Sequence, residues 1–204
     1  MPDAHTHDII TLVSGAALAP VTYVLFASRL PSETALLDTA LFFGAHVLSG
    51  VMFSPDLDID SSIDDRWGIF FWIWRPYMWV VPHRHRILSH GLIVSALLRL
   101  LYFYLVVVGL LFAVTWALGL IGIVFPTYYI WLTERLLALY SDHPRETLVF
   151  LIGFITGGAA HTIADWLVTG GKHFLRRFGI TIRRDYRGHD YWLPRVRRRR
   201  SYRR

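Results

Sequence analysis

Four long stretches of apolar residues dominate the pattern of the chain. They cover residues 9–28, 36–53, 91–125 and 148–169. Each is long enough to cross the hydrocarbon core of a bilayer, which takes about 17 to 25 residues of α-helix. The pattern therefore predicts an all-α, multi-pass membrane helical bundle, with about four transmembrane helices and additional interfacial helices.

The third stretch is longer than a single span requires. As one helix, residues 91–125 would rise about 52 Å against a core of about 30 Å. They form either one long tilted helix or a hairpin of two short spans. A fifth span would place residues 54–90, with their four Arg, and the basic C-terminal tail on opposite sides of the membrane. Since basic loops stay cytoplasmic, we predict four spans with both termini inside.

Two aromatic segments lie between the spans. Residues 67–81 hold four of the eight tryptophans and are interrupted by Arg75-Pro76. This segment is too short and too broken to span, and indole rings favour the headgroup level, so we expect it to lie in the cytoplasmic interface or to re-enter slightly. Residues 128–140 are a candidate counterpart on the outer side.

Composition and charge refine the picture. Only 18% of the residues are charged and 54% are hydrophobic, whereas a soluble domain carries about 25% charged residues. From Lys172 onward there are thirteen Lys or Arg and two Asp, while the rest of the chain is acidic. We therefore expect a transmembrane domain, residues 1–171, and a basic cytoplasmic tail, residues 172–204. The N-terminus lacks a basic n-region, so we expect no cleaved signal peptide.

Histidine and aspartate gather at the ends of the predicted spans. There is no cysteine, so a metal would have to be held by His nitrogens and carboxylate oxygens. Four groups lie on the predicted cytoplasmic side: His5, His7 and Asp8; Asp56, Asp58 and Asp60; His83, His85 and His90; and His161 and Asp165. Because they share one face, a bundle could bring them into one pocket. We predict a metal-binding domain over residues 1–171.

Each group also has an interpretation without metal. Residues 5–8 could be an unstructured terminus, and residues 54–60 an acidic turn or helix cap. The arginines of "HRHRILSH" could hold lipid phosphates while the histidines play no part. Asp165 could pair with Arg99, which lies about 13 Å along its helix from His90. His46, in mid-helix, is favoured as a hydrogen-bonded core histidine.

Taken together, the groups favour a metal. Mixed nitrogen and oxygen ligands suit Zn²⁺ best, with Mn²⁺ or Fe²⁺ as alternatives. Five to seven ligands exceed the need of one structural zinc, so we expect one or two ions. Paired ions are suited to phosphoester hydrolysis. The candidate phosphate-binding residues are Arg84, Arg86, Ser89 and Arg99.

An ordered set of motifs also carries a family resemblance. The motifs are "THD", "SPDLDID", "RWG", "WIWRPY", "PHR", "SHG" and "HTIADW". To about residue 190 the chain resembles a bacterial family of uncharacterised metal-binding membrane proteins. That family is similar to membrane-bound metal-dependent hydrolases of the DNA-damage response, and more distantly to zinc-dependent phospholipase C and P1 nuclease.

The resemblance implies a set of metal ligands. They are His7, Asp56, Asp58, His90, His161 and Asp165. The register of the hydrolase motif adds His85, while His83 repeats the same dipeptide out of register and is a neighbouring alternative. Where the hydrolases often have another His after the Pro-Asp-x-Asp motif, this chain has Ile59-Asp60.

Two functions follow as hypotheses. In the first, an inner-membrane metal-dependent hydrolase acts on a phosphoester or phospholipid from the cytoplasmic leaflet, with Asp58 and Asp60 as catalytic carboxylates. In the second, the metal is structural, and the basic tail binds anionic lipid or a partner. Nucleic acid is a less favoured ligand for the tail.

Overall fold

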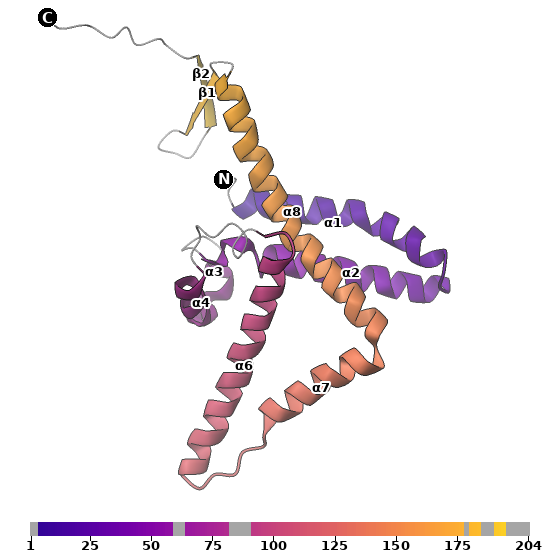
Figure 1. The fold of residues 1–204 in the computed structure, drawn as a ribbon, viewed down its shortest axis with the longest axis vertical. Coiled ribbons are helices and arrows are strands. Elements are labelled where there is room, and N and C mark those ends of the chain that lie inside the picture. Colours follow the sequence, from indigo (N-terminus) through magenta and orange to yellow (C-terminus); the bar gives the residue numbers. More distant parts are fainter. Residues whose placement is uncertain (1–3, 59–63, 82–90, 178–179, 185–189, 195–204) are drawn as a thin grey trace, which may run out of the picture. The chain divides into compact units, whose positions relative to one another are not determined.

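The computed structural model describes residues 4–58, 64–81, 91–177, 180–184 and 190–194, and up to Arg177 its regular elements are helices (Figure 1). The α-helices are α1 (Ala4–Ala27), α2 (Ser32–Val51), α3 (Asp64–Trp67), α4 (Arg75–Val80), α6 (Val94–Leu120), α7 (Tyr128–Asp142) and α8 (Pro144–Arg177). Two 3₁₀ helices are η1 (Pro55–Asp58) and η2 (Gly68–Trp74). The chain divides into two compact units. The larger unit is Asp3–Thr162, and the smaller unit consists of Ile163–Arg204 together with Met1–Pro2.

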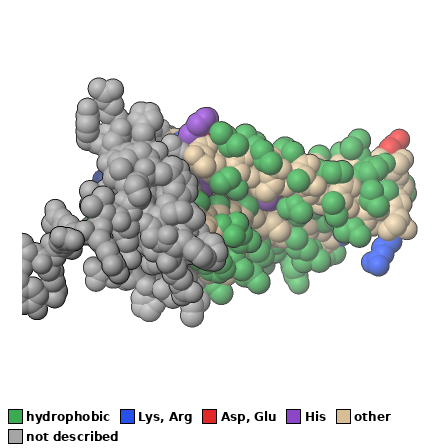
Figure 2. Space-filling model, turned by 90° about the horizontal axis from the view of Figure 1, so that it is seen from above, with side chains coloured by type: hydrophobic (Ala, Val, Ile, Leu, Met, Phe, Trp, Pro, Cys, Tyr) green, Lys and Arg blue, Asp and Glu red, His purple; other side chains and the backbone are tan. Residues whose placement is uncertain are grey.

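Four of the helices are long and apolar enough to cross a membrane. They are α1, α2, α6 and the part of α8 up to Val168. The four predicted apolar helices are thereby confirmed. Helix α6 runs unbroken for 27 residues, so the alternative of two short spans over residues 91–125 is excluded. Figure 2 shows a face of the molecule on which hydrophobic side chains predominate among those drawn in colour, with acidic and basic side chains visible at one end.

Glycines let α2 and α8 approach each other closely. A Cβ atom added at Gly157 would lie 2.0 Å from the carbonyl oxygen of His46, and one added at Gly153 would lie 2.4 Å from that of Phe42. The two glycines are four residues apart and face the same side of α8, which is the small-residue spacing that brings membrane helices into backbone contact. The crossing therefore depends on residues without side chains.

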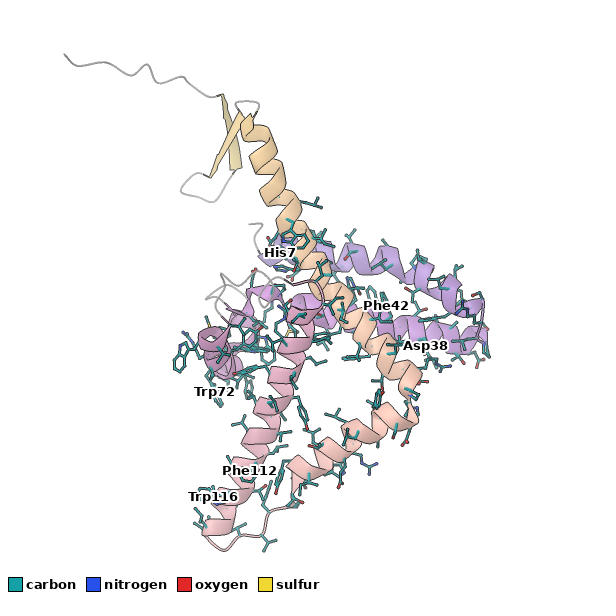
Figure 3. All side chains as sticks on the ribbon, in the orientation of Figure 1. His7, Asp38, Phe42, Trp72, Phe112 and Trp116 are labelled. Atoms are coloured by element: carbon teal, nitrogen blue, oxygen red, sulfur yellow. The ribbon has the colours of Figure 1, made fainter. Side chains whose placement is uncertain are left out.

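A cluster of aromatic rings forms the core of the larger unit. Trp74 is fully buried, and its ring centroid lies 5.8 Å from that of Phe53 and 5.7 Å from that of Tyr77. The hydroxyl of Tyr102 on α6 donates to the carbonyl oxygen of Ile73. Residues 67–81, predicted to be an interfacial segment, thus pack one face against α6. Their opposite face is exposed, as Trp72 shows in Figure 3.

Helix α7 follows α6 and packs against it. The hydroxyls of Tyr104 and Thr133 are 2.9 Å apart, and the rings of Phe112 and Tyr129 meet edge to face. None of the residues of α7, all of which the structure describes, is fully buried. The helix forms where residues 128–140 were expected to fold into an outer interfacial helix, and its place in the membrane stays a prediction.

The smaller unit contains the end of α8 and a pair of short strands. Strands β1 (Ile180–Arg184) and β2 (Asp190–Pro194) are antiparallel, with Ile182 opposite Trp192. The sequence analysis expected only a basic tail here and did not predict strands. The all-α prediction therefore holds for the four long apolar helices, and the two-stranded sheet is an addition to it.

Candidate metal centre

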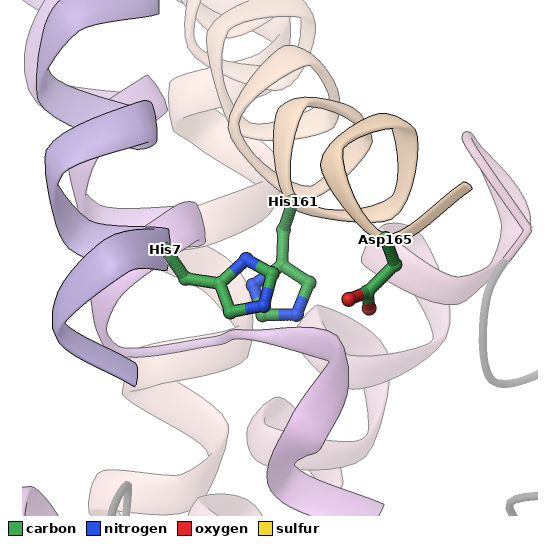
Figure 4. A group of neighbouring side chains, drawn as sticks. All are labelled: His7, His161 and Asp165. Atoms are coloured by element: carbon green, nitrogen blue, oxygen red, sulfur yellow. The ribbon is translucent and has the colours of Figure 1, made fainter. Parts of the chain in front are cut away.

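Two buried histidines meet at one end of the larger unit. His7 lies in the first turn of α1 and is 2% exposed, and His161 lies on α8 and is fully buried. Their rings are stacked, with centroids 3.6 Å apart and planes 11° from parallel (Figure 4). Residues 154 positions apart in the sequence thus place four imidazole nitrogens in a small volume.

Asp165 adds a carboxylate to this pair. It follows His161 by four residues on α8, and because the helix is continuous there, both side chains project from the same face. One ligand atom from each of His7, His161 and Asp165 lies within 4.8 Å of the other two (Figure 4). All three residues are buried, and the group has the composition to hold a metal ion, with its ligand atoms close enough together to share one.

The turn after α2 supplies a second carboxylate. Ser54 Oγ lies 3.1 Å from His161 Nδ1, and Asp56 Oδ2 lies 3.4 Å from His161 Nε2. The backbone N–H of Asp56 donates to Ser54 Oγ, which closes the turn. When Nδ1 carries the proton and donates to Ser54, Nε2 presents a lone pair toward the carboxylate. A proton or a metal cation between Nε2 and Oδ2 would relieve that repulsion.

Arg66 and Trp67 hold this turn in place. Arg66 donates to the carbonyl oxygen of Val51 at 2.7 Å and pairs with Asp8 at 2.6 Å, while Trp67 Nε1 donates to the carbonyl oxygen of Met52 at 2.9 Å. The last carbonyl groups of a helix have no hydrogen-bond partner within the helix, and these bonds satisfy two of them at the C-terminal end of α2. The start of α1, the end of α2 and α3 are therefore fixed to one another beside the candidate ligands.

His5, His7 and Asp8, grouped together in the sequence analysis, have different surroundings in the structure. His5 is exposed, Asp8 pairs with Arg66, and His7 alone of the three joins the cluster. Successive residues of a helix point in directions about 100° apart, so neighbours in sequence face different surroundings.

His46 has the hydrogen-bonded core environment that the sequence favours. Its Nε2 lies 3.0 Å from Ser14 Oγ and 3.2 Å from the carbonyl oxygen of Thr11, and its Nδ1 lies 3.0 Å from Thr156 Oγ1. Both nitrogens are therefore used within the bundle. This histidine connects α1, α2 and α8.

Arg99 is fully buried on α6 and reaches α8 just before His161. A Cβ added at Gly158 would lie 3.1 Å from Arg99 Nη2 and 3.4 Å from Ser49 Oγ, so the glycine makes room for the guanidinium group. The guanidinium group of Arg99 thus lies beside Gly158, which precedes His161 by three residues on α8. Its pairing with Asp165 and its role in binding phosphate both stay predictions.

Several predicted site residues lie outside the part of the chain that the structure describes. These are Asp60, His83, Arg84, His85, Arg86, Ser89 and His90, and the side chain of Asp58. Their roles as ligands, catalytic groups or phosphate contacts stay predictions. Conversely, the sequence analysis did not single out Ser54, Arg66 or Trp67, although "SPD" and "RWG" were among the quoted motifs.

A family model describes most of the chain. The model for "uncharacterized metal-binding protein (DUF2227)" matches residues 2–175. The chain belongs to this DUF2227 family. The match extends from α1 nearly to the end of α8, and so includes each described residue of the cluster, while β1 and β2 lie beyond it. No curated protein and no solved structure matches the chain.

The donor set suits a metal ion, in agreement with the metal-binding description of the DUF2227 family. Imidazole nitrogens and carboxylate oxygens are the ligands that first-row divalent ions take when no thiolate is present. With metal–ligand bonds of about 2.0–2.2 Å, neighbouring ligand atoms lie about 3.0–3.5 Å apart. The 3.4 Å between His161 Nε2 and Asp56 Oδ2 falls within that range. A divalent ion would also offset the carboxylate charge of Asp56 and Asp165, which are buried, and a buried charge is costly unless it is compensated.

Proposed function

We propose that the protein binds a divalent transition-metal ion at the cytoplasmic end of its membrane helices. His7, Asp56, His161 and Asp165 would hold the ion, with Zn²⁺ as the first choice and Mn²⁺ or Fe²⁺ as alternatives. The observation that carries the proposal is the buried group of His7, His161 and Asp165, with ligand atoms within 4.8 Å of one another. Asp58, His90 and either His85 or His83 would complete one or two metal sites.

The activity that this donor set supports best is hydrolysis of a phosphoester, with a phospholipid as the favoured substrate. A bound divalent ion supplies a hydroxide at neutral pH and stabilises negative charge on phosphoryl oxygens. Ser54 would keep the ring of His161 in one orientation, and Asp58 or Asp60 would accept a proton from water. Arg99, buried near His161, together with Arg84, Arg86 and Ser89, would bind the phosphate.

A structural metal is the second candidate. The proposed ligands come from the first turn of α1, the turn after α2 and the C-terminal half of α8, so one ion would tie three elements together. In that case the basic tail, residues 172–204, would carry the interaction of the protein with anionic lipid or with a partner.

The orientation rests on charge. The tail holds thirteen Lys or Arg, and such segments are retained in the cytoplasm. If the four apolar helices all cross the bilayer, both termini and the candidate metal centre would lie on the cytoplasmic side of the inner membrane.

The first experiment is elemental analysis of detergent-purified protein, wild type beside His7→Ala, His161→Ala and Asp56→Ala. His5→Ala is the matched control, because His5 is exposed and only two residues from His7. We expect one or two ions per chain in the wild type and the control, and a loss in the other three variants. Equal metal content in all five proteins would overturn the proposed site.

A second experiment separates the two candidate functions. The metal-loaded wild type and His161→Ala are assayed with bis(p-nitrophenyl) phosphate and with phosphatidylglycerol vesicles. Turnover that depends on metal and is lost in the variant supports the hydrolase. A site that binds metal and raises the melting temperature without any turnover of either compound favours the structural role.

A further inference from the structure

The segment formed by η2 and α4 has two faces with opposite surroundings. Phe71, Ile73, Trp74 and Tyr77 are buried in the aromatic core. On the other side Ile69 is 84% exposed and Trp79 is 82% exposed; Phe70, Trp72 and Val80 are also exposed. An exposed group of five large apolar side chains, two of them indoles, is unusual on a surface that meets only water.

Hydrogen bonds fix the height of this segment along the membrane helices. At its start, Trp67 donates to the carbonyl oxygen of Met52, directly after α2 ends. Further on, the Tyr102 hydroxyl donates to Ile73, and Tyr102 lies eight residues into α6, about 12 Å along its axis. The segment is therefore level with the end of α2 and the first turns of α6.

That height is where the bilayer surface lies if α6 crosses the membrane. With 27 residues α6 is about 40 Å long, so about 5 Å would project beyond each side of a 30 Å hydrocarbon core. Tyr102, about 12 Å along α6, would then lie about 7 Å inside that core, so the segment bonded to it lies among the upper acyl chains, just below the headgroups. Trp72 and Trp79 have the side chains most enriched at this depth.

A positive charge lies on the same segment. Arg75 is exposed at the start of α4, and its guanidinium carbon lies 5.4 Å from the centre of the Phe71 ring. An arginine beside indole and aliphatic side chains matches a surface that presents acyl chains below phosphate groups. Such a combination of exposed indoles, aliphatic side chains and one arginine is typical of segments that lie in the membrane interface.

We propose that the exposed face of η2 and α4 inserts into one leaflet of the bilayer, with its apolar side chains at the level of the upper acyl chains and Arg75 at the phosphates. Helix α4 also contacts η1, which begins with Pro55 and Asp56. The inserted segment thus holds the Asp56 turn at headgroup height. A phosphoester presented to the candidate metal centre would come from the headgroup layer rather than from bulk water.

The absence of cysteine from the chain permits a direct test by single-cysteine spin labelling. Ile69→Cys, Phe70→Cys and Trp79→Cys are labelled in full-length protein in vesicles of phosphatidylcholine and phosphatidylglycerol at a 3:1 ratio. Leu105→Cys on α6 serves as the reference for the bilayer interior, and Arg29→Cys between α1 and α2 as the reference for water; both residues are exposed. Collision with oxygen and with a water-soluble nickel chelate gives the depth of each label.

We expect the three labels to collide with oxygen more than Arg29→Cys does and with nickel less, at a shallower depth than Leu105→Cys. Labels that collide with nickel as freely as Arg29→Cys does would overturn the proposal. Labels shielded from both reagents would also overturn it, because a second copy or another protein would then cover this face.

If the cysteine variants do not fold, quenching of tryptophan fluorescence by brominated lipids replaces the test. It is compared between the wild type and the Trp72→Phe/Trp79→Phe double variant. A smaller quenched fraction in the double variant is expected, and an equal fraction would overturn the proposal. Neither measurement requires metal, so the outcome is separate from that of the proposed function.

Discussion

His46 and Thr156 are joined across the helix bundle, with His46 Nδ1 3.0 Å from Thr156 Oγ1. The other ring nitrogen of His46 reaches Ser14 on α1. One side chain of α2 thereby links the two helices that carry His7 and His161. Thr156 lies five residues before His161, and Ser14 lies seven residues after His7.

Replacement of His46 by Phe should weaken metal binding although His46 belongs to no ligand group. Phe keeps an aromatic ring, somewhat larger than imidazole, but loses the bonds to α1 and α8, so the positions of His7 and His161 relax. We expect a loss of about 1–2 kcal/mol in the free energy of unfolding and a several-fold lower metal affinity. The measurements are chemical denaturation in mild detergent and a competitive metal titration. His46→Gln, which can still form a hydrogen bond, should restore part of both, and wild-type metal affinity in His46→Phe would contradict the linkage.

The contact between α2 and α8 gives a second prediction. Gly157→Ala places a methyl group 2.0 Å from the His46 carbonyl oxygen, so the two helices must separate. We expect a loss of about 1–3 kcal/mol in stability, the usual range for overpacked cores. Gly44→Ala on α2 is the matched control, because a Cβ there has no atom within 4 Å among the residues that the structure describes, and it should change stability by less than about 1 kcal/mol. The melting temperatures of the two variants decide the matter, and similar values would count against the close crossing.

The four long apolar helices could be predicted because their signal is local. A run of apolar residues about as long as a bilayer is thick needs no tertiary information, and the four helices follow the four runs closely. The spacing of His161 and Asp165 is likewise readable, since four residues make about one helical turn. The Gly153 and Gly157 pair has the same periodicity and marks the contact with α2.

Other features could not be predicted because they depend on partners distant in sequence. Asp8 follows His7 directly, yet it pairs with Arg66, 58 residues away. Residues 67–81 are apolar on both faces, so their sequence does not show which side chains face the core. It could not be predicted that Trp74 is buried while Trp79 is exposed. The pairing of β1 with β2 was hidden by the high arginine content of the tail.

Ser54 should tune the candidate metal centre without being a ligand. Ser54→Ala removes the oxygen 3.1 Å from His161 Nδ1, so the imidazole loses its fixed orientation. Loss of such a supporting bond typically lowers metal affinity by about 10–100-fold. Competitive titration with a fluorescent chelator gives the affinity. The matched control is Ser49→Ala, which also removes a buried serine hydroxyl, five residues earlier at the end of α2, and should retain wild-type affinity. Equal losses in both variants would point to general damage to the bundle.

Metal removal should lower the stability of the protein, and only when the ligands are intact. An ion that binds the folded state and not the unfolded state stabilises it by RT ln(1 + [L]/Kd), about 2.7 kcal/mol when the free metal is at 100 times Kd. His7 on α1 and His161 on α8 would be held by the same ion, so its loss should also loosen the two helices from each other. We expect a chelator to lower the melting temperature of the wild type and of His5→Ala by several degrees, and added Zn²⁺ to restore it. His7→Ala and His161→Ala should melt at a lower temperature that neither chelator nor Zn²⁺ changes. A chelator effect of equal size in all four proteins would place the stabilising ion elsewhere in the chain.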